Sequence, residues 1–268
     1  MALRRLDAEL VRRNLSKSRE EAKSQIESGL VKVDGNIEKK PTRQVATHSA
    51  IVLIESSESF VSRGAYKLLG ALEIFEPLGL TLVDKHVLDA GASTGGFTQV
   101  SLLRGAREVV AVDVGYGQIA WNLRTDDRVH VIERFNIRNL TATDLPCEID
   151  AVVADLSFIS LTKVLPAIKN AVRPAADFVL MVKPQFEVGK ADIGDGVVKD
   201  PELRMAAVQK VCDHAIELGL SVVSVGASPL PGPAGNVEYF LWLKAGESAR
   251  FSGELADEIK SVVLKGPQ

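Results

Sequence analysis

Seven short apolar runs alternate with helical patterns from Tyr66 onward, and this alternation is what most constrains the fold. The runs are His86–Leu88, Glu108–Val112, Val129–Ile132, Ala151–Ala154, Phe178–Val182, Leu220–Val225 and Tyr239–Leu243. Strands separated by helices predict a parallel sheet with helices on both faces. Right-handed crossovers make such a sheet doubly wound, with its ligand crevice at the carboxyl ends of the strands. We therefore predict an α/β domain of this kind, in which the last run, after a loop rich in Pro and Gly, is a candidate antiparallel strand.

The composition is that of an ordinary globular protein, with 46% hydrophobic and 25% charged residues. The longest apolar runs, such as Phe178–Val182, have the length of buried strands and not of membrane spans. Arg4 and Arg5 are not followed by an apolar stretch, so no secretory signal is expected. Two distant cysteines, Cys147 and Cys212, and four histidines without a cluster predict a reduced, cytoplasmic protein with no metal site. The oligomeric state is not fixed by these features, and a monomer is our expectation.

Residues 1–55 have the pattern of a separate small α/β module. Two short helices come first, and Ser18 opens the second in a capping-box pattern. Val31–Val33 is a predicted strand, Asp34-Gly35 a tight turn, and Ile51–Ile54 the closing strand. A polar stretch without periodicity follows and predicts a linker. We assign residues 1–55 to this module, 56–63 to the linker and 64–268 to the larger domain.

Charge is unevenly distributed between these parts. The whole chain has a net charge of −3, but residues 1–43 carry 11 Lys and Arg against 7 Asp and Glu, a net charge of +4. A basic head on an acidic body favours contact with an anion such as RNA, although a solvated face often carries as many charges. The candidate RNA-binding residues are Arg4, Arg5, Arg12, Arg13, Lys17, Arg19, Lys23, Lys40 and Arg63.

The module also carries a fixed order of short motifs: a helix, a helix opened by Ser-Arg, a G-x-V-x-V-x-G stretch and a Lys-Pro pair. The residues are Arg5-Leu6-Asp7, Leu10, Ser18-Arg19, Ala22, Ile26, Gly29, Val31, Val33-Asp34-Gly35, Lys40-Pro41 and Val45. On these residues the module resembles the S4 RNA-binding domain. The resemblance implies that the exposed side of the two helices meets the phosphates of a structured RNA.

A glycine-rich stretch stands where the first strand of the larger domain should turn into a helix. Glycines there let backbone amides approach a ligand closely. Ser93 takes the place of the second Gly in the dinucleotide fingerprint G-x-G-x-x-G, and no Gly-Lys-Ser/Thr of a P-loop follows. The pattern that remains, D-x-G-x-x-x-G-G, resembles motif I of class I methyltransferases, which implies S-adenosylmethionine as the cofactor. The predicted cofactor-binding residues of this stretch are Asp89, Gly91, Ala92, Ser93, Thr94, Gly95, Gly96, Phe97 and Thr98.

A second acidic residue, Asp113, ends the next strand, 22 residues after Gly91. A carboxylate there can accept hydrogen bonds from both ribose hydroxyls of an adenosine. Taken alone, Asp113 has an alternative interpretation as a helix N-cap. Asn136, after the third strand, is a candidate for holding the adenine edge. Val114, Asp155 and Leu156, at the ends of the second and fourth strands, complete the predicted cofactor site.

Four ionisable residues are expected at the same crevice: Lys67, Asp155, Lys183 and Glu238. Asp155 and Lys183 directly follow buried runs, at strand ends where α/β enzymes place their chemistry. A single lysine at a strand end is more often a salt-bridge partner than a base. Two lysines and two carboxylates at one pocket are less readily explained in that way, so we predict that all four are catalytic.

These residues stand within four longer blocks, SRGAYKL at 62–68, DLSFIS at 155–160, VKPQFE at 182–187 and GNVEYF at 235–240. The Lys-Asp-Lys-Glu set is similar to that of RNA 2′-O-ribose methyltransferases of the FtsJ/RrmJ type, and the blocks resemble the haemolysin A (TlyA) family. That family joins an S4 domain to a Rossmann-like class I methyltransferase domain with a mostly parallel seven-stranded sheet. The resemblance implies 2′-O-methylation of cytidines in 16S and 23S ribosomal RNA, with ribosomal RNA or ribosomal subunits as partners.

A ribose 2′-hydroxyl is a poor nucleophile and must lose its proton as it attacks a methyl group. A lysine with an ordinary pKa of about 10.4 is neutral in only roughly one molecule in 2,500 at pH 7, so a basic role needs a lowered pKa. We predict Lys183 as the base or proton acceptor, Lys67 as its cationic neighbour, and Asp155 and Glu238 as the residues that orient the amines. In the alternative, Lys183 mainly steers the hydroxyl, and proximity to the methyl group supplies the acceleration.

Three other functions fit parts of the pattern. A membrane-active haemolysin or cytolysin, suggested by the family name, needs an insertable apolar or amphipathic segment that is not evident here. A non-catalytic rRNA-binding assembly factor would carry a vestigial cofactor site. A methyltransferase acting on DNA or a small molecule is opposed by the S4-like head and by Asp155-Leu156-Ser157-Phe158 in place of an Asn-Pro-Pro-Tyr motif.

Overall fold

The computed structural model describes residues 3–16, 18–27, 29–53, 60–189, 195–245 and 252–266. The chain separates into two compact units, Met1–Phe60 and Val61–Gln268. The division falls within the predicted linker 56–63, and the finer bounds 1–55 and 64–268 stay predictions. Residue Lys17 and residues 56–59 of the linker lie outside the described residues.

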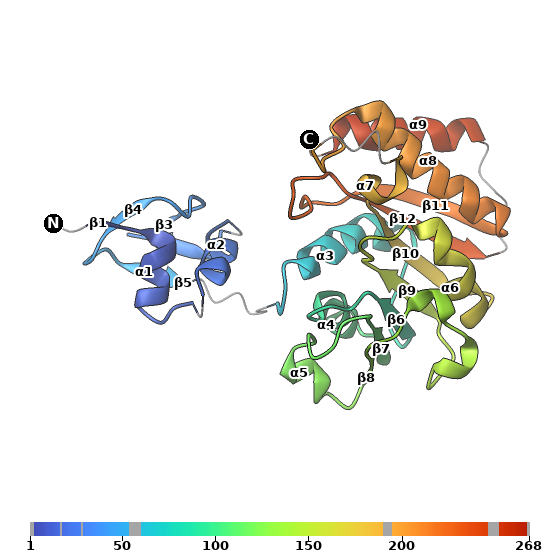
Figure 1. Ribbon diagram of the computed structural model, residues 1–268, viewed down its shortest axis with the longest axis horizontal. Coiled ribbons are helices and arrows are strands. Elements are labelled where there is room, and N and C mark those ends of the chain that lie inside the picture. Colours follow the sequence, from blue (N-terminus) through green and yellow to red (C-terminus); the bar gives the residue numbers. More distant parts are fainter. Residues whose placement is uncertain are drawn as a thin grey trace. The chain divides into compact units, whose positions relative to one another are not determined.

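The first unit packs two helices against two small sheets (Figure 1). The helices are α1 (Leu6–Arg12) and α2 (Arg19–Glu27), and the strands are β1 (Leu3–Arg5), β2 (Val31–Val33), β3 (Asn36–Ile37), β4 (Gln44–Ala46) and β5 (Ile51–Leu53). Strands β3, β2 and β5 form one sheet, and β1 pairs with β4 in the other. Leu6 and Leu10 of α1 and Ala22 and Ile26 of α2 are fully buried, and they form a core with the apolar strand residues.

Local chemistry accounts for the turns of this unit. The Ser18 hydroxyl accepts the Glu21 backbone N–H at 3.1 Å, as the capping-box pattern predicts for the start of α2. Asp34 and Gly35 have positive φ angles of 52° and 87°, the requirement of the tight turn that joins β2 to β3. The pairing of β1 with β4 was not predicted, since three-residue strands leave little periodicity to detect.

The second unit is built on a seven-stranded sheet in the order β11-β12-β10-β9-β6-β7-β8. The strands are β6 (His86–Ala90), β7 (Glu108–Val112), β8 (Val129–Ile132), β9 (Ala151–Ala154), β10 (Asp177–Val182), β11 (Leu220–Ala227) and β12 (Tyr239–Ala245). Strand β12 pairs antiparallel with β10 and with β11, and the other described pairings of this sheet are parallel. The predicted mostly parallel sheet with a last antiparallel strand is therefore confirmed.

Helices cover both faces of the sheet (Figure 1). On one face lie α3 (Gly64–Phe75), α4 (Gly96–Leu103) and α5 (Trp121–Arg124), with rings of α3 and α4 against Trp242 and Phe240 of β12. The other face meets α6 (Leu165–Ala171), α8 (Pro201–Glu217) and α9 (Ser252–Lys265). A short α7 (Pro184–Glu187) follows β10, and 3-10 turns occupy Glu76–Leu78, Ile137–Asn139, Ala142–Asp144 and Leu161–Lys163. Burial on both faces is why the central strands have continuous apolar sequences.

We expect Leu180→Ala to lower the free energy of unfolding of the larger unit by about 2–5 kcal/mol, because Leu180 is fully buried at the centre of β10. Chemical denaturation followed by tryptophan fluorescence measures this, since both tryptophans, Trp121 and Trp242, belong to this unit. Leu78→Ala is the control: Leu78 is 55% exposed, and its truncation should cost no more than about 0.5 kcal/mol. Equal effects of the two substitutions would contradict the described core.

Candidate active site

The crevice of the sheet opens between β6 and β9. These strands are neighbours in the sheet, whereas the chain runs from β6 through β7 and β8 on the far side before it returns. Such a reversal of strand order leaves space for a ligand at the carboxyl ends of the two strands. The glycine-rich loop leaves β6 at this edge, and Asp155 leaves β9 beside it.

The loop has a backbone that only some residues tolerate. Gly91, Ser93 and Gly95 have φ angles of 88°, 48° and 97°, and Gly95 is the N-cap of α4. At Gly91, a Cβ atom would lie 2.7 Å from the carbonyl oxygen of Asp155, so any side chain there would force the two strand ends apart. The glycine at position 91 is therefore required by close approach of backbones as well as by its φ angle.

Asp113 ties this loop to the end of β7. Its Oδ2 accepts the Ser93 N–H at 2.8 Å, and its Oδ1 accepts the Gly115 N–H at 2.6 Å. The N-cap alternative is wrong, because the next helix begins only at Trp121. Each carboxylate oxygen has a second lone pair that remains for a ligand, so the ribose contact of Asp113 stays a prediction.

Asp89 and Thr98 lie beneath the loop. Both side chains are fully buried, and the Thr98 hydroxyl donates to Asp89 Oδ2 at 2.6 Å. Asp89 Oδ1 is buried and has no hydrogen-bond partner among the described residues. Burial, with a smaller contribution from the Asp155 charge, raises the pKa of Asp89 to about 7. Asp89 and Thr98 thus support the loop from below, with one buried oxygen of Asp89 still uncommitted.

A cleft of about 270 Å³ joins the loop to the ionisable residues. Its lining combines the loop with Lys67, Asp155 and Lys183, and it includes Ser62, Arg63, Gly64, Gly91, Ala92, Ser93, Thr94, Gly96, Phe97, Ser157 and Pro233. Leu156 packs next to Gly91. Val114 is largely exposed, and Asn136 uses its side-chain oxygen to accept the Arg138 N–H, so neither lines this cleft.

The four predicted catalytic residues form two ion pairs. Lys67 is paired with Glu238, and Lys183 Nζ lies 2.5 Å from Asp155 Oδ1. Lys183 also donates to the Ser157 hydroxyl at 2.9 Å. The Lys67, Lys183 and Glu238 side chains are all buried, while Asp155 is partly exposed. The fold therefore brings together residues that are up to 171 positions apart in the chain.

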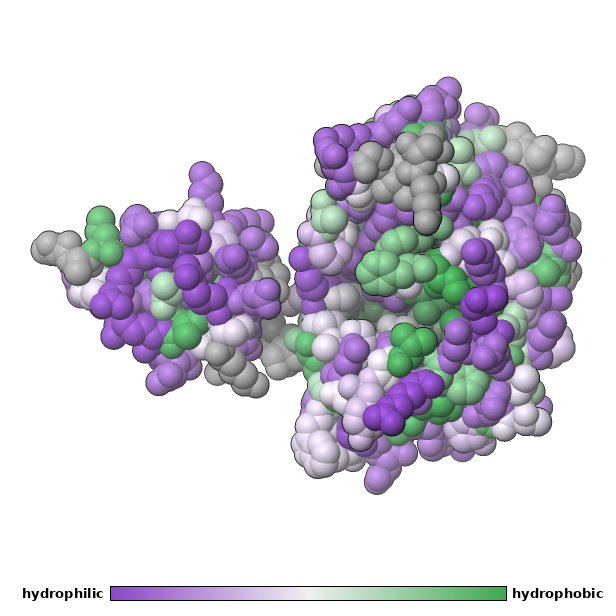
Figure 2. Space-filling view, viewed as in Figure 1, coloured by the Kyte–Doolittle hydropathy of each residue, from purple (hydrophilic) through white to green (hydrophobic). Residues whose placement is uncertain are grey.

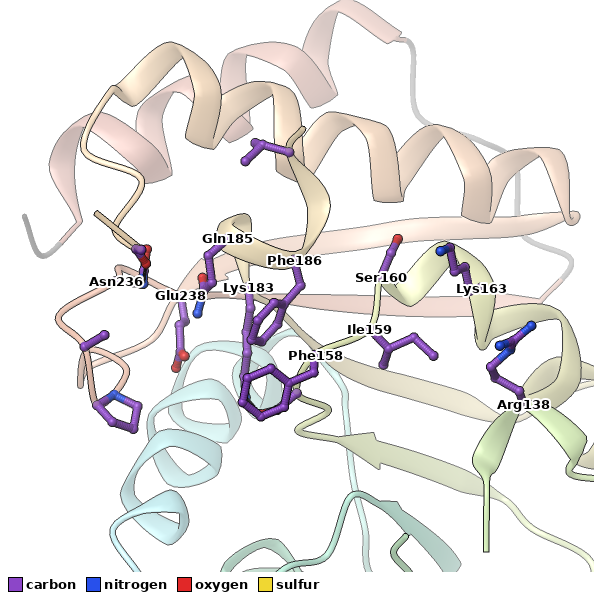
Figure 3. A pocket seen from close by; sticks show the side chains of 15 residues that line it. Arg138, Phe158, Ile159, Ser160, Lys163, Lys183, Gln185, Phe186, Asn236 and Glu238 are labelled. Atoms are coloured by element: carbon purple, nitrogen blue, oxygen red, sulfur yellow. Dashed lines mark hydrogen bonds between the residues drawn. The ribbon is translucent and has the colours of Figure 1, made fainter. Parts of the chain in front are cut away.

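A second hollow, of about 800 Å³, adjoins the cleft and shares Lys183, Ser157 and Pro233 with it. Figure 3 shows Lys183 and Glu238 towards one end of this hollow and Arg138 and Lys163 at the other. Its wall is largely apolar, and hydrophobic side chains gather near the middle of the visible face of the larger unit (Figure 2). Phe158 is 91% exposed, has a φ of 64°, and its ring lies 5.3 Å from that of Phe186.

Three residues of the site were missed in the sequence: Ser157, Glu187 and Asn236. Ser157 accepts a hydrogen bond from Lys183, and the buried Asn236 bridges the backbone of Gly196 and Val198 at the wall of the second hollow. Glu187 is buried behind Lys183. All three stand in the blocks that carry the family resemblance, and this position was the available signal.

Some of the predicted RNA-binding residues of the first unit form ion pairs with buried carboxylates, and others have exposed side chains. Arg5 and Arg19 bond to the buried Asp7, and Arg12 and Arg13 bond to the buried Glu9. The hydrogen bond from Arg12 lowers the pKa of Glu9 to about 2. The side chains of Arg4, Lys23 and Lys40 are exposed. Arg63, in the larger unit, donates to the Pro231 carbonyl at 2.8 Å and lines the cleft.

One cluster of metal-ligating types does form in the fold, away from the crevice. Ligand atoms of His86, Glu108 and Cys147 lie within 4.8 Å of one another at the amino ends of β6 and β7. His130 Nε2 lies 2.9 Å from Glu108, and His86 Nδ1 lies 3.2 Å from the Glu148 carbonyl. Glu108 and His86 therefore belong to a network of polar contacts. This cluster lies at the amino ends of the strands, away from the crevice at their carboxyl ends.

We expect Gly91→Ala to weaken S-adenosylmethionine binding at least about 10-fold, because the new Cβ must displace the Asp155 backbone. Isothermal titration calorimetry measures the dissociation constant. Gly117→Ala is the matched control: Gly117 also has a positive φ, of 67°, but nothing lies within 4 Å of the added Cβ. A Gly91 variant that binds as tightly as the Gly117 variant would show that close approach at β9 is unimportant.

The raised pKa of Asp89 predicts a pH dependence of stability in the cofactor-free protein. Between its unfolded value of 3.8 and about 7, the folded chain binds the extra proton, so the contribution of Asp89 to stability falls as pH rises through this window. Asp89→Asn should flatten the fall in the free energy of unfolding between pH 5 and pH 8. Asp126→Asn should not change the slope there, because Arg128 lowers the pKa of Asp126. Parallel slopes for wild type and Asp89→Asn would overturn the assignment.

Comparisons with known proteins agree with this architecture. The FtsJ-like methyltransferase family model matches residues 60–245, and the S4 domain model matches residues 4–51. The chain is 52% identical over 266 residues, 98% of each protein, to the 16S/23S rRNA (cytidine-2'-O)-methyltransferase TlyA of Mycobacterium tuberculosis strain H37Rv. It is 35% identical to Hemolysin A of Brachyspira hyodysenteriae, over 88% of this chain and 97% of that protein.

Among solved structures, a hemolysin-named protein of Streptococcus thermophilus superposes with a TM-score of 0.76 at 35% identity, over 99% of this chain and 96% of the other. In the part of the chain that the structure describes, no helix is long and apolar enough to cross a membrane. The predicted fold class, a Rossmann-like methyltransferase domain with a small S4 domain before it, is confirmed. The chain belongs to the FtsJ-like methyltransferases, in the TlyA family that carries an S4 domain ahead of the catalytic domain.

Proposed function

We propose that this enzyme transfers a methyl group from S-adenosylmethionine to the ribose 2′-hydroxyl of cytidines in 16S and 23S ribosomal RNA. The observation that carries the proposal is the position of Lys183, which lines both the cleft at the glycine loop and the adjoining hollow. A residue that lines two adjoining spaces can hold the methyl acceptor in one space close to the methyl donor in the other. The relatives named for cytidine 2'-O-methylation supply the nature of the acceptor.

The cleft fits the cofactor in its chemistry. In the Gly91–Gly96 loop, a ligand can approach the backbone closely. Asp113 offers carboxylate lone pairs as hydrogen-bond acceptors, and Asp89 has one buried oxygen without a hydrogen-bond partner among the described residues. Loop backbone, Asp113 and Leu156 would hold the cofactor, with Asp155 at its reactive end. When bound, S-adenosylmethionine supplies an electrophilic methyl group. The adenine contact of Asn136 and the cofactor contact of Val114 stay predictions, since neither residue lines the cleft.

Lys183 would fix the acceptor hydroxyl. An ammonium group has three N–H donors, of which Ser157 takes one, so a donor remains for the hydroxyl oxygen while the Asp155 carboxylate pairs with the charge. In its neutral form, Lys183 is an amine whose lone pair can accept a proton. That amine takes the hydroxyl proton as the oxygen attacks the methyl group. Glu238 holds Lys67 beside this pair, and Lys67 adds a positive charge that stabilises the developing oxyanion.

The second hollow suits a nucleotide that has left its stack. The exposed Phe158 ring offers a face for a base, and Arg138 and Lys163 at the far end provide cations for phosphates. The S4 domain, through Arg4, Lys23, Lys40 and the flanking arginines, would hold the ribosomal RNA outside the target nucleotide. We keep Lys17 in this set from the sequence alone.

We expect Lys183→Ala to lower methyl transfer to ribosomal RNA by at least about 1,000-fold while the dissociation constant of S-adenosylmethionine changes little, because cofactor contacts come from the loop. Transfer of radiolabelled methyl to rRNA or to ribosomal subunits measures the first quantity, and calorimetry the second. Lys169→Ala, on the partly exposed part of α6, is the control and should retain full activity. An active Lys183→Ala enzyme would sink the assignment of Lys183.

The same proposal fixes the product. Mapping of 2′-O-methyl groups in rRNA from cells with and without the gene should show loss at cytidines of both subunits. Methyl groups on bases, or no change in rRNA, would contradict the proposed reaction. Liposome leakage by the pure protein, compared with the Lys183→Ala variant, tests the membrane-active alternative, for which we expect no leakage from either.

A further inference from the structure

Glu187 is a buried carboxylate that the proposed reaction does not use. It ends α7, the single helical turn that follows Lys183 at the end of β10. Only 4% of Glu187 is exposed. Placing an acid in such an environment is costly unless its oxygens are bonded, and burial raises the pKa of this carboxyl above its usual value. Glu187 lies four residues after Lys183, the proposed proton acceptor, so the partners of Glu187 are where a reason for this cost is sought.

The partners of Glu187 belong to the loop after β9. Its Oε2 accepts the Ser160 hydroxyl at 2.5 Å, and its Oε1 accepts the Leu161 backbone N–H at 2.7 Å. Ser160 in turn caps the 3-10 turn Leu161–Lys163 by accepting the Thr162 N–H. One carboxylate therefore holds both the side chain and the backbone at the point where this loop re-enters regular structure.

The two segments that Glu187 joins also meet at the site. The loop carries Asp155 and Ser157, which both contact Lys183, and Phe158, whose ring meets that of Phe186 in α7. These contacts lie at the cleft and the second hollow, where solvent and ligands have access. The Glu187 contacts with Ser160 and Leu161 are buried, and Ser160 also lines the second hollow.

A third element anchors Glu187 from the other side. Lys210 of α8 donates to the Glu187 backbone carbonyl at 2.6 Å, and its Nζ lies 3.8 Å from Oε2. Helix α8 is the longest described helix and packs on β11 and the core of the larger unit. Glu187 is thus bonded to α8 on one side and to the loop after β9 on the other.

We propose that Glu187 is a positioning residue, which fixes the loop 155–161 against α7 and so sets the spacing of Asp155 and Ser157 about Lys183 Nζ. The inference rests on the proposed methyl transfer at Lys183. It assigns the carboxylate a role in orientation: without it, the Ser160–Leu161 corner lacks its buried acceptor, and the loop relaxes towards the hollow. Misplacement of reacting groups by about 1 Å can cost on the order of 100-fold in rate.

The test compares Glu187→Ala and Glu187→Gln in the full chain. We expect Glu187→Ala to lower kcat about 10- to 100-fold, while the dissociation constant of S-adenosylmethionine stays within about threefold, because the glycine loop is held by Asp113 and Asp89 instead. Glu187→Gln should recover most of the lost kcat, since its amide oxygen can accept the Leu161 N–H and its amide nitrogen can donate to Ser160. Rescue of this kind reports hydrogen-bond geometry and not charge.

Asp177→Ala is the matched control for a merely structural effect. Asp177 is also 4% exposed. It begins β10, at the end of the strand away from Lys183 and α7, and it bonds to Trp242 and Lys85. A general loss of stability would lower kcat equally in Asp177→Ala and Glu187→Ala at matched fractions of folded protein, and would overturn the proposal. So would a joint loss of cofactor binding in Glu187→Ala. Inactivity of the wild-type enzyme on rRNA would instead refute the proposed function itself.

Discussion

The parallel pairing of β6 with β9 is the constraint on which the site depends. Ala90 and Ala154 are opposite each other at the ends of these strands, and the Asp155 N–H donates to the Ala90 carbonyl at 3.1 Å. Gly91 then passes so close to the Asp155 carbonyl that no side chain fits between them. The glycine-rich loop and Asp155, which we propose to be catalytic, therefore leave the sheet as one backbone unit. Any shift of the loop moves Asp155, and through its ion pair also Lys183.

The burial of the two ion pairs at this edge is not readily explained as a contribution to the stability of the fold. Removing a charge from water costs several kcal/mol even when it is paired, and well-packed apolar groups often serve equally well or better. Lys67, Lys183 and Glu238 are nonetheless all buried here. Each lysine has its own carboxylate, so the set is electrically neutral and stays tolerable in the interior. What such a set provides, and apolar side chains do not, is oriented hydrogen-bond donors and acceptors at the cleft, as the proposed methyl transfer requires.

The sequence predicted the sheet well because strands buried on both faces are uninterrupted apolar runs, and all seven, from His86 to Leu243, form strands. Strand ends then located Asp155 and Lys183. Which lysine pairs with which carboxylate could not be predicted, because Lys67 and Glu238 lie 171 positions apart in the sequence. The sequence predicts the arginines of the first unit as RNA contacts, but it does not predict that the buried Asp7 and Glu9 pair with four of them. Likewise, histidines without a sequence cluster meet around Glu108, because neighbouring strands bring them together.

The antiparallel strand β12 has a consequence for how the enzyme is made. Because β12 runs against its neighbours, its first residues lie at the edge where β9 and β10 end, and Glu238 arrives there from just ahead of Tyr239. β12 also fills the place between β10 and β11, so β11 joins the sheet only through it. In a chain growing on the ribosome, Lys67, Asp155 and Lys183 are complete long before this strand emerges. Strand β12 therefore closes the sheet and brings Glu238 to the other three ionisable residues in one step, after the rest of the sheet has been synthesised.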